Sequence, residues 1–204
     1  MVVNMENAFR YPLKDAKWIG KVLIGGVLMC VPIVNFMVFG YLMRILDDAR
    51  LKKEPTLPEW QDWGALFQEG FMGFIVGLCY GMVLVLISLL GIIPFVGCLI
   101  LPIKIAISFI MGPVVMIALC FYLEKKDLSA AFNFKGIIDK IKINLVDYLI
   151  VALVTGVIGF FIVLVCVFGA ILIIPLLLAL VAWFYIALVS CRLYGEIFST
   201  VKTV

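Results

Sequence analysis

Three long apolar stretches, separated by short polar segments, set the organisation of this chain. They cover residues 19–43, 71–123 and 148–191, and their only charged residues are Lys21 and Lys104. A transmembrane helix needs about 20 predominantly apolar residues, so the second and third stretches are each long enough for two crossings. With breaks at the turn-forming segments GIIPFVG and VFGA, the pattern predicts four spans, at residues 71–92, 99–123, 148–167 and 171–191.

Lysine and arginine gather in the segments between these stretches and are absent from the turns at 91–98 and 167–171. By the positive-inside rule, the charged segments share the cytoplasmic face. The sequence therefore predicts two transmembrane hairpins in the plasma membrane of an archaeon or bacterium, with both termini cytoplasmic.

The first apolar stretch conflicts with a single crossing, because basic segments lie on both sides of it. Pro32 removes a backbone donor and disfavours helix at the preceding residue, while Asn35 tolerates turn geometry. Each half is then about 12 residues, or roughly 18 Å, which is too short to cross. We expect a short re-entrant or interfacial hairpin broken at Pro32 and Asn35; the alternative is one proline-kinked span with the N-terminus outside.

The segment LPEWQDWGALFQEGF, residues 57–71, combines aromatic and polar residues between two apolar stretches. Trp60, Trp63 and Phe67 recur at helical spacing, and Pro58 suits a first helical turn. Because tryptophan favours the headgroup level, we expect a short interfacial helix here, with Trp18 as a further interface residue. The alternative is a loop whose tryptophans pack on the helix bundle.

A second amphipathic segment, residues 129–145, links the two hairpins. Apolar Phe134, Ile137 and Ile141 follow helical spacing, whereas Lys135 and Lys140 are assigned to a polar face. Such basic faces attract anionic lipid at about 1 kcal/mol per charge. The expected partners are thus the bilayer, including anionic lipid, and a membrane protein or a second copy of the chain, with no nucleic acid.

Composition supports the membrane class. The 204 residues are 66% hydrophobic and 14% charged, with a net charge of +3 and a mean hydropathy of +1.25. Soluble domains average roughly 45–50% apolar and about 25% charged residues. The fold class is therefore all-α, a polytopic membrane helix bundle forming one domain over residues 1–204, with segments 1–56, 57–123 and 124–204.

Catalytic and metal-binding patterns are sparse. The chain has no histidine, the commonest general base, and its six cysteines are scattered without a CxxC motif. The adjacent Asp47 and Asp48 point to different sides of a helix. We expect no enzymatic activity, no cofactor and no metal site.

Two intramembrane features remain as candidates. An ionisable residue within a span is by default a functional hypothesis, and Lys104 is one; its alternative role is to snorkel toward the nearby interface. Gly73, Gly77 and Gly81 form a GxxxGxxxG stripe, which permits close helix packing within the chain or between copies.

Residues 8–71 resemble a family of membrane proteins. The shared text is D..W at Asp15 and Trp18, then IGG, P..NF...GY..R, and LPEW.DWG.LF. This pattern is similar to domain-of-unknown-function family 4013, and in outline to the membrane domain of some glycerophosphodiester phosphodiesterases. The resemblance implies a multi-pass archaeal or bacterial membrane protein and no activity.

Two functions fit these observations. The first is a noncatalytic scaffold or accessory subunit that acts through its interfacial helices. The alternative is a small transporter, channel or lipid-handling protein, with a path lined by the broken first hairpin and by the span at residues 99–123, where Gly112 and Pro113 mark a kink. A water-filled cavity reaching Lys104 from one face would favour the alternative, whereas a helix bundle that is solid through its middle, with grooves only toward lipid or a partner, would favour the scaffold.

Overall fold

The computed structural model describes residues 5–90, 96–169 and 173–200, and these ranges contain helices and connecting loops but no strand. The α-helices are α1 (Met5–Arg10), α2 (Trp18–Leu28), α3 (Asn35–Arg50), α4 (Trp63–Leu90), α5 (Val96–Lys125), α6 (Phe134–Ile143), α7 (Leu145–Gly169) and α8 (Ile173–Thr200). Two short 3-10 helices, η1 (Pro12–Lys14) and η2 (Leu128–Phe132), lie in the connections. The predicted all-α class is confirmed.

Four helices are long and apolar enough to cross a membrane. Within the described residues these candidate spans are Trp63–Leu89, Ile100–Lys125, Leu145–Cys166 and Leu177–Thr200. They match the four predicted spans in number and order, although α4 begins earlier and α8 ends later than the hydropathy pattern alone indicates. The apolar α2 is only 11 residues long and falls short of a span.

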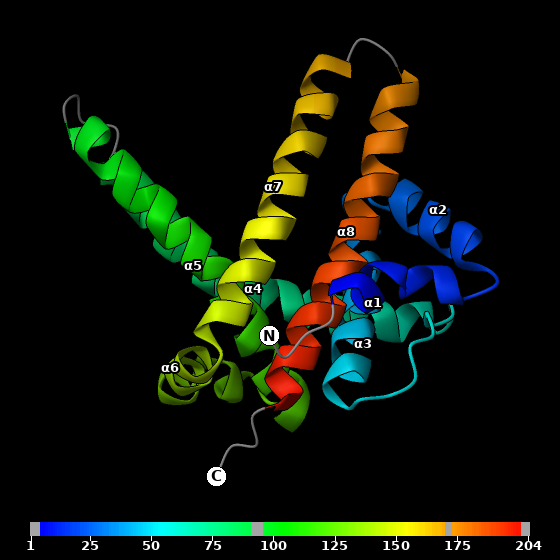
Figure 1. Ribbon diagram of the computed structural model, residues 1–204, viewed down its shortest axis with the longest axis horizontal. Coiled ribbons are helices and arrows are strands. Elements are labelled where there is room, and N and C mark those ends of the chain that lie inside the picture. The colour runs from blue at the N-terminus through cyan, green and yellow to red at the C-terminus, as the bar shows by residue number, and fades with distance from the viewer. Residues whose placement is uncertain (1–4, 91–95, 170–172, 201–204) are drawn as a thin grey trace.

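The long helices form two pairs that diverge from a common base. In Figure 1, α4 and α5 run away to one side, while α7 and α8 rise together on the other. The base holds α6, the charged half of α3 and the C-terminal end of α8 (Figure 1). We call this base the charged end and the opposite ends of the four long helices the far end.

The core lies in the lower part of the molecule, where α3 and α8 meet the end of α5. Tyr41, Ile45 and Phe184 are among its fully buried side chains. The upper parts of the long helices instead expose large apolar residues such as Leu86, Phe160 and Leu178. Exposed apolar surface on this scale suits helices that lipid surrounds.

Glycines allow backbones to touch where α3 crosses α4. A Cβ atom on Gly40 would lie 1.9 Å from the carbonyl oxygen of Leu66, and one on Gly70 would lie 1.8 Å from that of Phe36. Small residues at a crossing let helices approach this closely. The predicted stripe behaves differently: Gly73 faces the Met43 side chain, but added Cβ atoms on Gly77 and Gly81 meet nothing within 4 Å. The close crossing therefore uses Gly40 and Gly70, while Gly77 and Gly81 face open space in this chain, and a contact of the stripe with a second copy stays a prediction.

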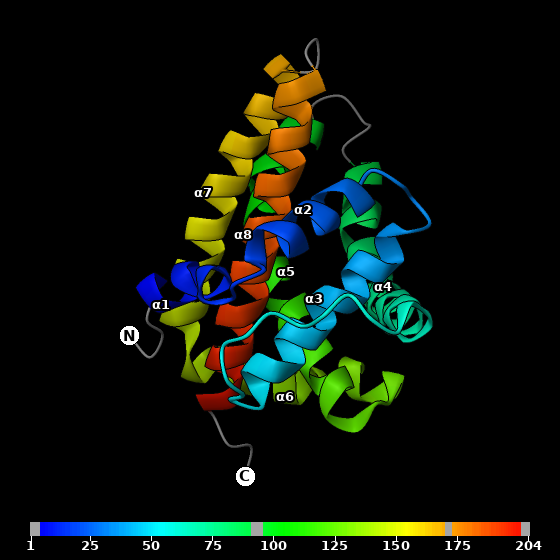
Figure 2. The same ribbon diagram turned by 90° about the vertical axis from the view of Figure 1, so that its right-hand side faces the viewer.

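The first apolar stretch is a helix, a break and a second helix. α2 ends at Leu28, the chain turns through the segment that contains Pro32, and α3 begins at Asn35 (Figure 2). The two helices have little contact with each other, because α2 packs mainly on α8 while α3 packs on α4 and α8. The predicted break is confirmed, and whether this segment re-enters the membrane stays a prediction.

Residues 57–71 do not form one helix. Helix α4 begins only at Trp63 and continues through Phe67 into the first span. We call residues 51–62 the strap. The strap contains turns and irregular chain but no helix, and Lys52 and Asp62 near its two ends each have a φ of 56°. The predicted interfacial helix over residues 57–62 is therefore wrong, and the alternative of a loop that packs on the bundle holds for the strap.

The linker between the hairpins is helical, as its spacing predicts. α6 carries the expected apolar residues, and Ile137 is buried. Lys140 is also buried, at 2% exposure, although the pattern assigns it to a polar face. Its ammonium donates a 3.0 Å hydrogen bond to the carbonyl oxygen of Phe198 at the end of α8 and lies 4.1 Å from the centre of the Phe198 ring.

Candidate functional site

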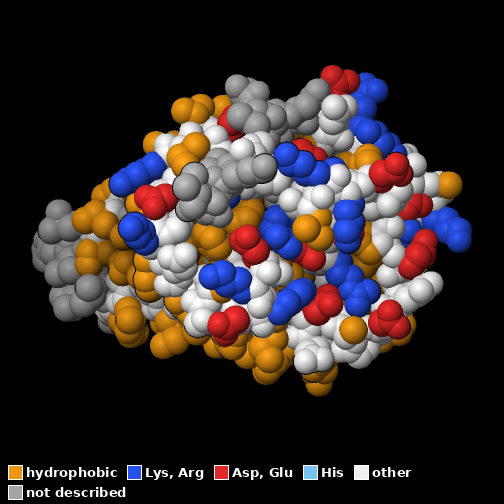
Figure 3. All heavy atoms as spheres, turned by 90° about the horizontal axis from the view of Figure 1, so that it is seen from below, with side chains coloured by type: hydrophobic (Ala, Val, Ile, Leu, Met, Phe, Trp, Pro, Cys, Tyr) orange, Lys and Arg blue, Asp and Glu red, His pale blue; other side chains and the backbone are white. Residues whose placement is uncertain are grey.

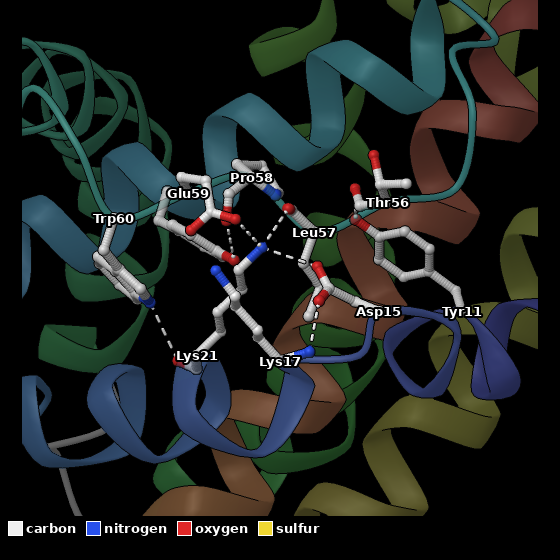
Figure 4. A network of polar contacts seen from close by, with 10 residues as sticks. Tyr11, Asp15, Lys17, Lys21, Thr56, Leu57, Pro58, Glu59 and Trp60 are labelled. Carbon is white, nitrogen blue, oxygen red and sulfur yellow. Dashed lines mark hydrogen bonds and ion pairs between the residues drawn. The ribbon is translucent and has the colours of Figure 1, made fainter.

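A buried lysine holds the strap against the N-terminal helices. The Lys21 ammonium on α2 lies 2.7 Å from an Asp15 carboxylate oxygen, 2.8 Å from a Glu59 carboxylate oxygen and 2.8 Å from the carbonyl oxygen of Leu57 (Figure 4). Only 5% of Lys21 is exposed. The three N–H donors of this ammonium thus bond to three acceptors from two different segments. We call this cluster the Lys21 anchor.

The charges of the anchor stabilise each other. Burial by itself would lower the pKa of Lys21, but the hydrogen bonds and charges of Asp15 and Glu59 outweigh it, and the pKa is raised. Burial would likewise raise the pKa of Asp15, yet the hydrogen bonds from Lys21 and from the Lys17 amide lower it. Both groups are therefore held in their charged forms across the neutral pH range.

Side chains from α1 to α3 also take up the carbonyl groups of the strap. Tyr11 donates a 3.0 Å hydrogen bond to the Thr56 carbonyl oxygen, and Tyr41 donates a 2.8 Å bond to that of Pro58. Because these carbonyl groups and that of Leu57 bond to side chains, residues 56–58 have their acceptors satisfied without a helix. This is the physical reason that the strap stays non-helical despite its helical spacing of aromatics.

The tryptophans predicted for the interface occupy three settings. Trp60 stacks on Tyr41 at 4.1 Å and on Trp63 at 5.8 Å, and its indole nitrogen donates to the carbonyl oxygen of Lys21 at 3.0 Å. Trp63 is 42% exposed, and Trp18 contacts the Tyr185 ring edge-on at 6.5 Å. Trp60 therefore packs within the protein, while Trp63 remains on its surface.

Phe67 belongs to a separate aromatic cluster at the crossing of α3 and α4. The Phe36 ring meets Phe67 at 5.5 Å and Phe71 at 5.6 Å, both edge-to-face. Edge-to-face pairs at this distance contribute about 0.5–1.5 kcal/mol beyond simple burial. Together with the Gly40 and Gly70 contact, this cluster fixes α3 against the start of the first span.

We use the name platform for α1, η1, α2, α3 and the strap. Its helices pack on α8 and α4, and the Lys21 anchor joins α2 and Asp15 to the strap. Seen from below, the charged end carries basic and acidic side chains interspersed over much of its surface (Figure 3). Several are paired: Arg44 with Glu69 at 3.1 Å, and Arg192 with Glu196 at 2.6 Å.

A partly open, apolar cavity of about 440 Å³ lies between the two long helix pairs. Helices α3, α5, α7 and α8 line it, among others through Phe39, Met43, Ser108, Gly112, Met116, Ala152, Thr155, Gly156, Gly159, Trp183, Ser190 and Tyr194. Its volume falls in the usual range for ligand pockets, about 300–1,000 Å³. The hydroxyl groups of Thr155 and Ser190 donate hydrogen bonds to carbonyl oxygens of their own helices. These hydroxyl hydrogens are therefore not available to a ligand in the cavity.

The remaining predicted site residues lie apart from the Lys21 anchor. Lys104 is half-buried on α5, one helical turn from Ser108 toward the far end, and makes no ion pair with the described residues. Pro32 is exposed in the break between α2 and α3. Asn35 begins α3, and its side-chain oxygen is buried and accepts no hydrogen bond from any described residue.

The sequence did not predict the anchoring role of Lys21, because a lysine near the start of an apolar stretch is typical of a residue at the membrane boundary. The signal that could have indicated this role is the presence of two acidic residues: Asp15 lies six residues before Lys21, and Glu59 lies in the polar segment that follows α3. Among the described residues, no group of three or more cysteine, aspartate and glutamate side chains could hold a metal ion.

Comparison with known proteins places the chain in a family. Residues 24–173 match the family described as "Protein of unknown function (DUF4013)". The chain belongs to the DUF4013 family. It is also 29% identical over 137 residues to an uncharacterized protein of Methanocaldococcus jannaschii, a match that covers 62% of this chain and 47% of that relative. The chain thus spans about half the length of that curated relative, and no solved structure matches it.

Proposed function

We propose that this DUF4013 protein is a noncatalytic membrane scaffold or accessory subunit that presents the platform to a partner protein. The observation that carries the proposal is the location of the residues in the sequence pattern that resembles the family. Asp15, Tyr41 and Trp60 build the Lys21 anchor and its surroundings, and Gly40 lies at the α3–α4 crossing. None of these residues lines the cavity.

A tied platform suits a docking role because its surface is ordered before a partner arrives. Ordering a loop on binding costs free energy, so a strap already held by Lys21, Tyr11 and Tyr41 lowers the cost of association. The strap also presents exposed polar side chains, including Lys52, Lys53, Glu54 and Gln61. We place this platform at the cytoplasmic side of the plasma membrane, following the distribution of basic residues.

Site-specific photocrosslinking in the native membrane tests the scaffold proposal. A photoreactive phenylalanine analogue placed at Lys52 or Gln61 samples the platform, and the same analogue at Leu86 or Phe160 samples the exposed apolar faces of the spans. We expect one discrete protein adduct from the platform positions. The yield of these adducts should fall when Lys21→Met is added, because the strap then loses its bonds to Lys21.

Two results would contradict the scaffold proposal. One is the absence of any discrete protein adduct from both platform positions while the span positions react efficiently. The other is an adduct that forms equally well from platform and span positions, since that pattern indicates collision within the membrane. A variant carrying Lys17→Met in place of Lys21→Met controls for the lost charge, because Lys17 is exposed and its side chain is not part of the anchor.

The cavity favours lipid handling as a second candidate function. Its lining is mostly apolar, which suits an acyl chain better than an ion or a hydrated solute. This observation distinguishes lipid handling from the channel and transporter roles grouped with it. The likeness to the membrane domain of glycerophosphodiester phosphodiesterases stays a prediction.

A further inference from the structure

We propose that the cavity between the helix pairs binds one acyl chain of an anionic phospholipid, whose headgroup contacts Lys104. This inference rests on the second candidate function, lipid handling, and names its ligand class. It is independent of the scaffold proposal, because the cavity and the platform residues that carry that proposal do not overlap.

The cavity is kept open by glycines that have no packing role. An added Cβ atom on Gly112 of α5 or Gly156 of α7 would meet nothing within 4 Å, and both residues line the cavity. Glycine inside a helix costs about 1 kcal/mol relative to alanine. At Gly40 and Gly70 a backbone contact explains that cost, whereas at Gly112 and Gly156 the missing side chain adds to the open volume of the cavity.

The cavity has the dimensions of one lipid tail. Along α5 it extends from Ser108 to Leu119, which is roughly 16 Å at 1.5 Å per residue. The hydrocarbon core of a bilayer is about 30 Å thick, so this length is close to the depth of one leaflet. Because the candidate spans put lipid around these helices, an open apolar cavity at this depth meets acyl chains and not water.

Lys104 marks the headgroup end of the cavity. It precedes Glu124 by 20 residues, or roughly 30 Å along α5, so the two residues lie near opposite boundaries of the hydrocarbon core. Ser108, the first α5 residue that lines the cavity, is one turn deeper, and a lysine in a helix points toward the helix N-terminus. Its ammonium can therefore reach the level of lipid phosphates.

Charge complementarity selects an anionic lipid at this end. At the charged end, Arg44 pairs with Glu69, Arg50 with Asp47, and Arg192 with Glu196, so these cations already have carboxylate partners. Lys104 makes no ion pair with the described residues, and Lys125 is the nearest other cation on α5. A phosphate at the far-end boundary would supply the missing partner.

Native mass spectrometry of the full chain, delipidated in detergent and titrated with defined lipid, tests this site. The probes are phosphatidylglycerol, which is anionic, and phosphatidylcholine, which is zwitterionic, with matched acyl chains. We expect wild type to retain one phosphatidylglycerol, bound about fivefold more tightly than phosphatidylcholine, for one interfacial charge worth about 1 kcal/mol. Gly156→Leu should abolish the retained lipid of either kind by filling the cavity.

Lys104→Met tests the headgroup separately from the tail. It should reduce phosphatidylglycerol binding to the level of phosphatidylcholine, with one lipid of either kind still retained. A preference that persists in Lys104→Met would overturn the headgroup assignment while leaving a lipid tail in the cavity. Wild type that retains no lipid would overturn both the site and lipid handling as a function.

Matched variants keep the test interpretable. Gly77→Leu places the same side chain at another open glycine, outside the cavity, and should leave lipid retention as in wild type. Gly112→Leu fills the cavity from the opposite wall and guards against a folding defect peculiar to Gly156→Leu. If both filling variants retain lipid like wild type, the cavity is not its site.

Discussion

Replacing Lys21 with methionine should untie the strap while leaving the four spans in place. Methionine keeps most of the apolar stem of lysine, so the packing of α2 on α8 is largely preserved. What disappears is the ammonium and its bonds to Asp15, Glu59 and the Leu57 carbonyl. Asp15 retains the 2.8 Å hydrogen bond from the Lys17 amide, which limits the cost of its lost partner.

The magnitude follows from which of these bonds are sheltered from water. A hydrogen bond to a charged group contributes about 1.5–3 kcal/mol. The bonds to Asp15 and to the Leu57 carbonyl are largely shielded, whereas the Glu59 side chain is 53% exposed and is given no share. Because the Asp15 and Leu57 bonds share one ammonium, we take a combined loss of about 3 kcal/mol, a roughly 100-fold increase in strap opening.

Hydrogen–deuterium exchange of the strap, read by mass spectrometry in nanodiscs, measures this opening. Amides of residues 54–62 should lose about 100-fold of their protection in Lys21→Met, while amides of α7 keep theirs. Lys17→Met removes a neighbouring exposed lysine and should change nothing. Unchanged strap protection in Lys21→Met, or an equal loss in Lys17→Met, would refute the anchoring role of Lys21.

Three further predictions concern the Lys21 anchor and the crossing of α3 and α4. The strap should stay anchored from about pH 5 to pH 10, because the lowered pKa of Asp15 protects it against acid and the raised pKa of Lys21 protects it against base. Release of the strap, read by tryptophan emission, should begin only as the pH falls below the ordinary aspartate pKa of 3.8 or rises above the ordinary lysine pKa of 10.5. Gly70→Ala should lower thermal stability in detergent by about 1–3 kcal/mol or more, since its Cβ would meet backbone atoms of α3. Gly77→Ala on the same helix should be neutral or stabilise by up to about 1 kcal/mol, and a loss equal to that of Gly70→Ala would contradict the assignment of the crossing.

Hydropathy was sufficient to predict the spans, because lipid demands long apolar helices whatever their neighbours are. The break at Pro32 was equally predictable, since proline disfavours helix at the residue before it and disrupts the hydrogen bonding of the preceding turn. Both signals are local, and both are confirmed by the bounds of α2, α3 and the four long helices.

The strap and the crossing could not be read from local patterns. The spacing of Trp60, Trp63 and Phe67 is helical, yet Tyr41 and Lys21, 17 and 36 residues from their acceptors, bond the strap carbonyls and keep it extended. The glycine stripe leaves its packing partner open for a related reason. Whether Gly77 or Gly70 meets another helix depends on where α3 crosses α4, which is a property of the whole fold.

The sidedness of the platform is the measurement that tests this account most directly. Single cysteines introduced as Ala16→Cys, Lys52→Cys and Asp139→Cys, in a chain whose native cysteines are replaced by alanine, lie at exposed positions before α2, after α3 and on α6. A membrane-impermeant maleimide applied to sealed vesicles of each orientation reports the side of each site. We predict that all three react from the same face, the cytoplasmic one. Reaction of Ala16→Cys and Lys52→Cys from opposite faces would show that residues 18–50 cross the bilayer, and it would contradict the platform as a single surface.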